Sequence, residues 1–294
     1  MLHGIFKHYQ KRRPKNSDSN LQSVDGRAHE HAYVTFSAAT NVGNVRETNQ
    51  DNLYVMQPVL TYESLYHYTY SGSHKLPALF AICDGMGGGK NGEKASYEAV
   101  RLIEQAPVDA LEQRSDAELE NFFHELYQKM NDTVYQLYGT TGALVGCTAT
   151  MLYIDSRRIY MVNAGDSPGM WLTPSGLNVL TQSDNRANQL YQLGQISEAE
   201  RWTHKTKNQL TQYVGMNPEE VRISPHICRL DRIGSTTRFL ICSDGLLDKN
   251  TFDEIEEQLR ENDIRTAAQS CVMQAMNAGS RDNVSAIVIQ VEAC

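Results

Sequence analysis

The sequence predicts an α+β domain built from layered sheets and helices. Eight short segments rich in β-branched and aromatic residues follow one another from residue 33 onward, as is typical of half-buried strands. Helical patterns occur in three separate blocks instead of alternating with every strand, which favours antiparallel strands with segregated helices. With 294 residues, of which 40% are hydrophobic, the chain can bury the core of one large domain or two small ones.

The charge and cysteine content narrow the class of protein. A formal net charge of -8 argues against nucleic acid as the main partner, because nucleic acid favours a basic surface. The six cysteines include no CxxC pair, which indicates buried free thiols in a reducing compartment. No apolar run reaches the ~20 residues that a membrane-spanning helix needs, and the opening MLHGIFKHYQKRRPK is unlike a secretory signal. We therefore expect a cytoplasmic protein.

The N-terminal end differs in composition from the rest of the chain. Residues 1–32 begin with a basic cluster and continue with polar, turn-rich sequence. We expect them to form a mobile basic tail, either a solvated arm or a weak contact for an acidic surface. Residues 33–294 then form the folded domain.

The predicted strands close into hairpins at two clear turns. Asp155–Arg157 separates one pair of strands, and Pro174–Gly176 separates another, with Pro and Gly at positions suited to a turn. The tyrosine-rich insertion at residues 60–76 is expected to be an extended hairpin or a surface for a partner. In chain order the strand-like segments are YVTFSAAT, NLYVM, ALFAIC, TATMLYI, RIYMVNAG, MWLTPSGLNVL, TRFLIC and NVSAIVIQV.

Helical periodicity appears in three regions. After Ala95, apolar residues recur at spacings of four, seven and eight positions, which marks one buried helical face. Ser115 and Glu118 form a capping box that opens a second helix. The third region covers residues 251–278, with a break near Asn262 and an end at Gly279.

The glycine-rich segment after ALFAIC matches nucleotide-binding patterns poorly. Gly87, Gly89 and Gly92 satisfy GxGxxG between a strand and a helix. A dinucleotide site is disfavoured, because Asp84 at the strand end would place a negative charge beside the pyrophosphate. A Walker-type phosphate loop is one residue too short, and Asn91 stands where Ser or Thr would hold magnesium. The carboxylate of Asp84 needs another explanation.

Aspartates at the ends of several strands provide an explanation for the carboxylate of Asp84. Asp84, Asp166 and Asp244 follow three predicted strands, while Asp51 and Asp282 precede two others. Since antiparallel neighbours place a C-terminal end beside an N-terminal end, all five can gather at one rim of the sheet. Each Asp alone would indicate only a turn. Together they repel one another unless cations neutralise them, and oxygen ligands select hard ions such as Mg2+ or Mn2+.

Seven motifs follow one another along the chain: GNVRETNQDN (43–52), CDGMGG (83–88), GCTAT (146–150), AGDS (164–167), LTQYVG (210–215), SDGLLD (243–248) and SRDNVSAIVI (280–289). In this order they resemble the motifs of the metal-dependent PPM-type protein serine/threonine phosphatases, most closely the bacterial members. The resemblance runs from about residue 35 to residue 291. It implies a four-layer α/β/β/α sandwich, with two stacked antiparallel sheets flanked by helices and a binuclear Mn2+ or Mg2+ site at one end.

The resemblance also implies a set of metal ligands. Asp84 would bridge two ions, and the carbonyl of Gly85 would bind one of them. Asp244 and Asp282 would complete the shell of one ion. Asp51 would serve the other, partly through water.

Arg46 and Asp84 are the residues expected to take part in catalysis. Two metals about 3.5–4 Å apart can lower the pKa of a bridging water and stabilise the phosphoryl group, so that a metal-bound hydroxide attacks the phosphomonoester. Arg46 could bind the phosphate with two donors, which a lysine could not copy. Asp166 matches the position that binds a third, weaker metal in several bacterial relatives.

Three further residues are expected to support the metal shell. Gln50 replaces a glutamate that the family often has there, and it keeps an oxygen near metal-bound water. Thr148 either supports the shell or packs within its strand. Asn283 either orients Asp282 or forms a turn.

Residues 168–215 resemble the family's flap, a variable segment beside the active site that influences substrate choice. Within it, His204, Lys205 and Lys207 form a basic patch. The patch either attracts the acidic flank of a phosphopeptide or is a solvated helix face.

The sequence as a whole predicts metal-dependent hydrolysis of phosphoserine and phosphothreonine in proteins. Phosphorylated proteins would be the substrates, and a cognate Ser/Thr kinase would be the enzyme whose action is reversed. The alternative is a catalytically inactive pseudophosphatase that acts as a binding module. The intact aspartates argue against this alternative, because a binding module has no need of their mutual repulsion.

Overall fold

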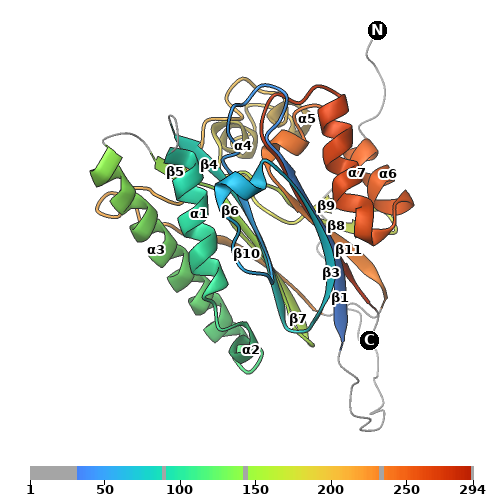
Figure 1. The fold of residues 1–294 in the computed structure, drawn as a ribbon. Coiled ribbons are helices and arrows are strands. Elements are labelled where there is room, and N and C mark those ends of the chain that lie inside the picture. Colours follow the sequence, from blue (N-terminus) through green and yellow to red (C-terminus); the bar gives the residue numbers. More distant parts are fainter. Residues whose placement is uncertain (1–31, 88–90, 142–144, 232–234, 293–294) are drawn as a thin grey trace.

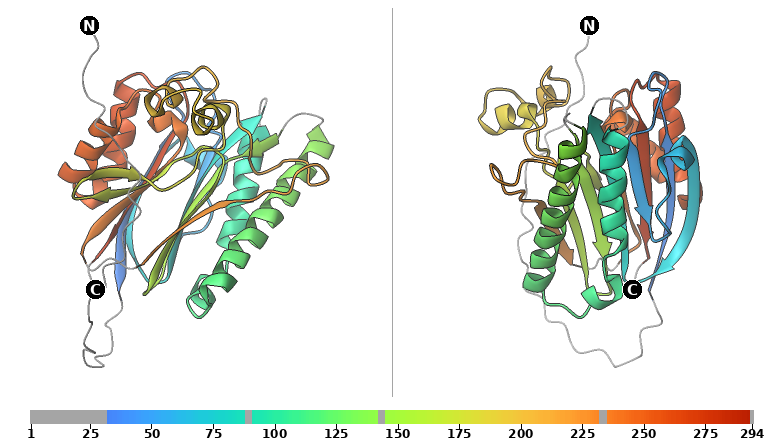
Figure 2. Two further views of the ribbon diagram at one scale, coloured as in Figure 1. Left: turned by 180° about the vertical axis from the view of Figure 1, so that it is seen from behind. Right: turned by 60° about the vertical axis from the view of Figure 1, so that its left-hand side comes forward.

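Two sheets lie face to face between two layers of helices (Figure 1). The computed structural model describes residues 32–87, 91–141, 145–231 and 235–292. Helices α1 (Asn91–Glu104) and α3 (Asp116–Thr141) cover one sheet, while α6 (Phe252–Glu261) and α7 (Ile264–Asn277) cover the other (Figure 2). The predicted four-layer α/β/β/α sandwich is confirmed. The predicted tail at residues 1–32 lies outside the described residues, apart from Ala32.

Sheet A has the strand order β3-β1-β12-β11-β8-β9, and all of its neighbours pair antiparallel. It joins strands from the beginning, middle and end of the chain, so the two ends of the domain share one sheet. Its strands are β1 (Tyr33–Asn41), β3 (His67–Lys75), β8 (Gly169–Thr173), β9 (Gly176–Val179), β11 (Thr237–Cys242) and β12 (Val284–Val291).

Sheet B has the order β10-β7-β6-β4-β2, with β5 paired to the end of β4. All its pairs are antiparallel. A dinucleotide fold requires a parallel sheet, so this pairing excludes the nucleotide interpretation of the glycine-rich segment. Its strands are β2 (Asp51–Val55), β4 (Ala78–Gly87), β5 (Val145–Cys147), β6 (Ala149–Ile154), β7 (Arg158–Ala164) and β10 (His226–Asp231).

The predicted hairpin at residues 60–76 is wrong. The segment forms a short 3-10 helix, η1 (Tyr62–Leu65), and then β3, which pairs with β1 along the edge of sheet A. Tyr68 and Tyr70 of β3 pack against the core between the sheets. This packing removes part of their apolar surface from water, which favours the place of β3 in the sheet.

All eight predicted strand segments contain strands, and both predicted turns join hairpins. The helix starts are also confirmed. Ser115 and Glu118 exchange capping hydrogen bonds before α3, and α7 ends just before Gly279, which adopts a φ of 86°. The described residues also contain three short α-helices and a second 3-10 helix: α2 (Val108–Leu111), α4 (Arg186–Gln192), α5 (Glu198–Arg201) and η2 (Asp244–Leu246).

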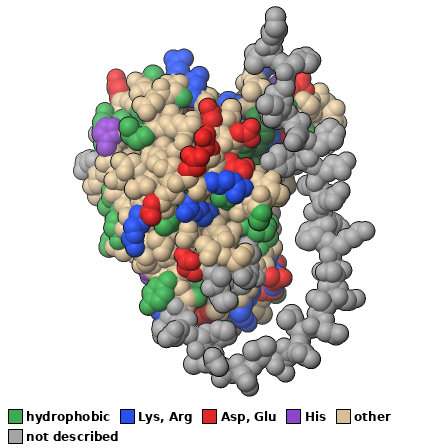
Figure 3. Space-filling model, turned by 90° about the vertical axis from the view of Figure 1, so that its right-hand side faces the viewer, with side chains coloured by type: hydrophobic (Ala, Val, Ile, Leu, Met, Phe, Trp, Pro, Cys, Tyr) green, Lys and Arg blue, Asp and Glu red, His purple; other side chains and the backbone are tan. Residues whose placement is uncertain are grey.

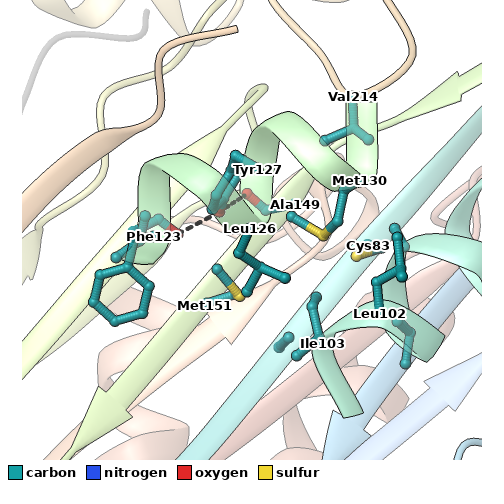
Figure 4. Close-up of a cluster of buried hydrophobic side chains, with 14 of the residues drawn as sticks. Cys83, Leu102, Ile103, Phe123, Leu126, Tyr127, Met130, Ala149, Met151 and Val214 are labelled. Atoms are coloured by element: carbon teal, nitrogen blue, oxygen red, sulfur yellow. Dashed lines mark hydrogen bonds between the residues drawn. The ribbon is translucent and has the colours of Figure 1, made fainter. Parts of the chain in front are cut away.

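The core has one layer between the sheets and one beneath each pair of helices. Between the sheets, the rings of Phe36 from β1 and Phe80 from β4 meet edge to face at 5.0 Å. Under α3, the hydroxyl of buried Tyr127 donates to the carbonyl oxygens of Ala149 at 2.9 Å and of Val162 at 3.0 Å (Figure 4). These bonds fix α3 against sheet B and satisfy a polar group inside the core.

The surface over α6 and α7 has mixed charge. Figure 3 shows acidic and basic side chains side by side on this face, with hydrophobic side chains scattered among them. No helix among the described residues combines the length and the apolar character that crossing a bilayer requires.

Candidate metal centre

Strand register brings the five predicted aspartates together at one end of the sandwich. In sheet B, Asp51 at the start of β2 lies directly opposite Asp84 on β4. In sheet A, β11 and β12 pair antiparallel, so Asp244 after β11 and Asp282 before β12 reach the same end. Asp166 follows β7. After burial, the charges of the other four carboxylates raise the pKa of Asp84.

Asp51 joins the two sheets through hydrogen bonds. Its Oδ2 accepts a hydrogen bond of 2.8 Å from Ser243 and one of 2.6 Å from Ser285, both of which belong to the sheet A side of the site. Its Oδ1 is buried and has no hydrogen-bond partner among the described residues. Because buried carboxylate oxygens are almost always satisfied, this bare oxygen fits a cation ligand.

A second row of polar side chains supports this arrangement. Thr40 lies 2.7 Å from the Ser285 hydroxyl, and Asn49 donates to Thr40 at 2.8 Å. Sequence reasoning missed Ser243, Ser285, Thr40 and Asn49. A serine within the apolar run VSAIVIQV was the signal that could have revealed Ser285.

The electrostatic environment opposes ionisation of the aspartates. Burial raises the pKa of Asp51 to about 7, although hydrogen bonds from Ser285 and Ser243 act in the other direction. Burial and then the charge of Asp244 raise the pKa of Asp166 to about 7, and burial with Asp282 raises that of Asp244 to about 6. Burial and the charge of Asp51 also hold the pKa of Asp84 well above its usual range. The cluster needs positive charge to be fully ionised at neutral pH.

Arg46 supplies part of that charge through Asp282. Its Nε and Nη2 donate to the two carboxylate oxygens of Asp282 at 2.9 and 2.8 Å, in a two-pronged pair. The Arg46 side chain is 53% exposed, so its outer face is open to solvent. In the arrangement shown here, no three carboxylate, imidazole or thiol groups of the described residues converge to hold an ion.

Gly85 sits where a side chain would not fit. A Cβ atom at this position would lie 2.2 Å from the carbonyl oxygen of Gly92. The Gly85 N–H donates to the carbonyl of Gln50 at 3.0 Å, which holds the end of β4 against the start of β2. The glycine therefore permits close backbone packing beside Asp84.

The three predicted supporting residues all contact the backbone of the site. Thr148 accepts a 3.0 Å hydrogen bond from the Asp84 N–H. The side chain of Asn283 accepts from the Gln50 N–H at 2.9 Å and donates to the carbonyls of Val42 and Thr48. It thereby fixes the loop that carries Arg46. The side chain of Gln50 points to the Gly87 carbonyl, 3.4 Å away.

The predicted flap divides into two parts. Its beginning forms β8 and β9, which belong to sheet A, because their apolar residues extend the core under α6 and α7. The remainder contains α4 and α5 at the aspartate end of the sandwich (Figure 1). Asn185 connects it to the site by donating to Asp166 at 3.3 Å. Asp184 accepts from the Gly165 N–H at 3.0 Å and pairs with His226 at 2.6 Å.

Fold and site together define a two-sheet α+β sandwich with a carboxylate cluster at one end, and solved serine/threonine phosphatases share this fold. A family model described as protein phosphatase 2C matches residues 67–283, a range that includes Asp84, Asp166, Asp244 and Asp282 and begins after Arg46 and Asp51. The chain belongs to the protein phosphatase 2C family.

Individual relatives cover almost the whole domain. The serine/threonine phosphatase stp of Listeria welshimeri is 24% identical over 254 residues, 85% of this chain and 93% of the relative. The protein phosphatase PhpP of Streptococcus pneumoniae is 28% identical over 267 residues, 88% of this chain and 98% of the relative. The catalytic domain of the serine/threonine phosphatase PstP, solved in complex with two manganese ions, has a TM-score of 0.70 at 24% identity, covering 88% of this chain and 99% of that domain.

Proposed function

We propose that this protein hydrolyses phosphoserine and phosphothreonine in proteins, using two Mn2+ or Mg2+ ions at the aspartate cluster. The gathering of five aspartates, with one buried and unpartnered oxygen on Asp51, carries this proposal. Two facts about similar proteins support it. The relatives stp and PhpP are phosphatases, and the similarly folded PstP domain holds two manganese ions.

The donor set fits hard divalent cations, because it consists of oxygens alone. Asp51, Asp84, Asp244 and Asp282 would hold the two ions, together with the carbonyl of Gly85. Asp166 would hold a third. When bound, the ions would lower the pKa of a water molecule and offset the charge of the phosphoryl group.

The chain's own residues position these parts. Ser243 and Ser285 hold one oxygen of Asp51 and leave the other free for a ligand. Thr148 holds the backbone of Asp84 through its N–H. Arg46 carries a half-exposed guanidinium on the rim, where it can bind phosphate oxygens with the donors that face solvent.

The substrates would be phosphorylated proteins, and a Ser/Thr kinase would supply them. The described cysteines are free thiols, and four of them are buried. Free thiols of this kind support a reducing compartment such as the cytoplasm as the place of action.

Hydrolysis of a phosphothreonine peptide by the purified protein tests the proposal. We expect activity in Mn2+ or Mg2+, none in EDTA, and a loss of at least about a hundredfold in Asp244→Asn. Asp253→Asn is the matched control, since Asp253 is exposed in the first turn of α6 and should leave activity unchanged. A folded protein that binds metal but hydrolyses nothing would instead indicate the pseudophosphatase.

A further inference from the structure

Two consecutive residues of the flap hold two consecutive residues of the aspartate centre. The Asp184 N–H donates to the Gly165 carbonyl at 3.0 Å, and Oδ2 of Asp184 accepts from the Gly165 N–H at 3.0 Å. The next flap residue, Asn185, donates to Oδ2 of Asp166 at 3.3 Å. The place of the Asp166 carboxylate therefore depends on where these two flap residues lie.

The orientation of the Asn185 amide is determined by the helix that it begins. Its Oδ1 accepts a hydrogen bond of 2.9 Å from the Asn188 N–H, as the N-cap of α4. Because the amide oxygen is used by this cap, the amide nitrogen is the group that faces Asp166. The start of α4 thus fixes the direction of the contact with Asp166.

The carboxylate of Asp184 is itself held by residues from two other segments. Its Oδ1 lies 2.6 Å from Nε2 of His226, the first residue of β10, and its Oδ2 also accepts from Gln212 at 2.8 Å. Gln212 in turn bonds both backbone groups of Ser224, with its Oε1 2.8 Å from the N–H and its Nε2 3.0 Å from the carbonyl. Asp184 therefore links the Gly165 loop, the flap and the start of β10.

His226 is the ion-pair partner of Asp184 among the described residues. The Asp184 side chain is 10% exposed, and a carboxylate this deeply buried needs donors on each oxygen. Because a carboxylate only accepts, Nε2 of His226 carries the hydrogen, whether the ring is neutral or charged.

Strand pairing places His226 beside the strand that leads to Asp166. In the register of β10 with β7, His226 lies opposite Asn163. Asn163 donates to the Gly165 carbonyl at 3.2 Å. Gly165 is therefore held from β7 as well as from the flap, and a shift of Asp184 would have to break contacts on both sides.

We propose that Asp184 and His226 are positioning residues for the ion that Asp166 would hold. His226 fixes Asp184, which fixes the loop at Gly165, so that the Asp166 carboxylate keeps one place in the centre. This role rests on the proposed function, in which Asp166 holds a third ion. The other two ions should not depend on it, because different contacts, such as those from Ser243 and Ser285 to Asp51, hold their ligands.

The test measures Mn2+ binding by calorimetry in the wild type and in Asp184→Asn, His226→Ala and His226→Gln. We expect the first two variants to weaken the third, weakest ion about tenfold and to leave the two tighter ions within about twofold, as for residues that orient a metal ligand. His226→Gln keeps an N–H donor and should restore most of the affinity. The double variant Asp184→Asn/His226→Ala should bind no more weakly than Asp184→Asn alone, because His226 acts through Asp184.

Asp231→Asn is the matched control. Asp231 lies at the other end of β10, opposite Arg158 of β7, and pairs with Arg229 at 2.9 Å. Its substitution removes an acid–base pair from the same strand at a distance from the aspartates. All Mn2+ affinities should equal those of the wild type.

Four results would overturn the role of the pair. They are an unchanged affinity for the weakest ion in both single variants, equal weakening of all ions, additive effects in the double variant, or a wild type that binds two ions only. Mn2+ binding needs no turnover, so a protein that shows the expected binding but hydrolyses nothing would refute the phosphatase proposal alone. A protein that binds no Mn2+ would refute both.

Discussion

Replacing Asp51 by Asn should stabilise the metal-free protein, although it removes a predicted ligand. The carboxyl of Asp51 has an ordinary pKa of 3.8, and burial raises it to about 7 in the folded protein. At ~1.4 kcal/mol per pKa unit, ionising Asp51 at pH 8 costs the fold about 4 kcal/mol. The Asn side chain avoids this cost but leaves a buried N–H without an acceptor, which costs about 1–3 kcal/mol. A net gain of about 1–3 kcal/mol remains.

The pH dependence follows from the direction of the shift. Well below its ordinary pKa of 3.8, the carboxyl is neutral in both the folded and the unfolded chain, so its ionisation costs nothing. As the pH rises from about 4 to about 7, Asp51 ionises in the unfolded chain while it stays protonated in the folded chain, so the wild type loses stability that the Asn variant keeps. The advantage of Asp51→Asn should therefore be present at pH 8 and absent at pH 5.

Urea unfolding in EDTA at pH 8 and pH 5 measures the effect. In the same assay, added Mn2+ should stabilise the wild type much more than the variant. Asp155→Asn is the matched control. Asp155 is buried but paired with the Arg158 guanidinium at 2.7 Å, so its loss should destabilise the protein by about 3 kcal/mol with or without Mn2+. An Asp51→Asn protein that is less stable than the wild type in EDTA at pH 8 would refute the reasoning.

Three more substitutions separate the roles of donor geometry, backbone space and core polarity. Arg46→Lys should lower kcat/KM about tenfold in steady-state kinetics, because a lysine cannot copy the two-pronged donor pair. An unchanged kcat/KM would show that Arg46 does not bind the substrate. Gly85→Ala should abolish Mn2+-dependent stabilisation in a thermal melt, because its Cβ would lie 2.2 Å from the Gly92 carbonyl oxygen; a normal Mn2+ response would show that the backbone can yield there. Tyr127→Phe should cost about 1–3 kcal/mol of stability in urea unfolding, because the carbonyls of Ala149 and Val162 lose the hydroxyl donor. The same variant should keep the kcat/KM of the wild type. A loss of activity at equal stability would contradict this purely structural role.

Most of the fold could be predicted because its strands and helix ends carry local signals. The strand containing Phe80 is an uninterrupted apolar run, and Ser115 with Glu118 marks a helix start by itself. The partner of strand β3 could not be predicted in this way. Its sequence HYTYSGSHK alternates tyrosines with polar residues, which indicates a strand but not that this strand pairs with β1.

The candidate site was predictable in its aspartates but not in its serines or its contacts. Position at a strand end gave Asp84 and Asp244, because antiparallel pairing determines where such residues gather. The pairing of Arg46 with Asp282 joins residues 236 positions apart, and it depends on side-chain conformation that no local pattern encodes. For the same reason, Lys205 and Lys207 look alike in the sequence, whereas in the folded flap Lys205 is exposed and Lys207 is half-buried.

The hydrogen bonds from Ser243 and Ser285 to Asp51 link the two sheets at the aspartate centre. Asp51 belongs to one sheet and the two serines to the other side of the sandwich, so any shear of one sheet across the other would pull these groups apart. Cations bound there would oppose such a shear of the two sheets. A substitution at the distant Phe36–Phe80 contact that shifts the sheets would weaken cation binding. By thermodynamic linkage, bound cations would oppose that shift by the same free energy.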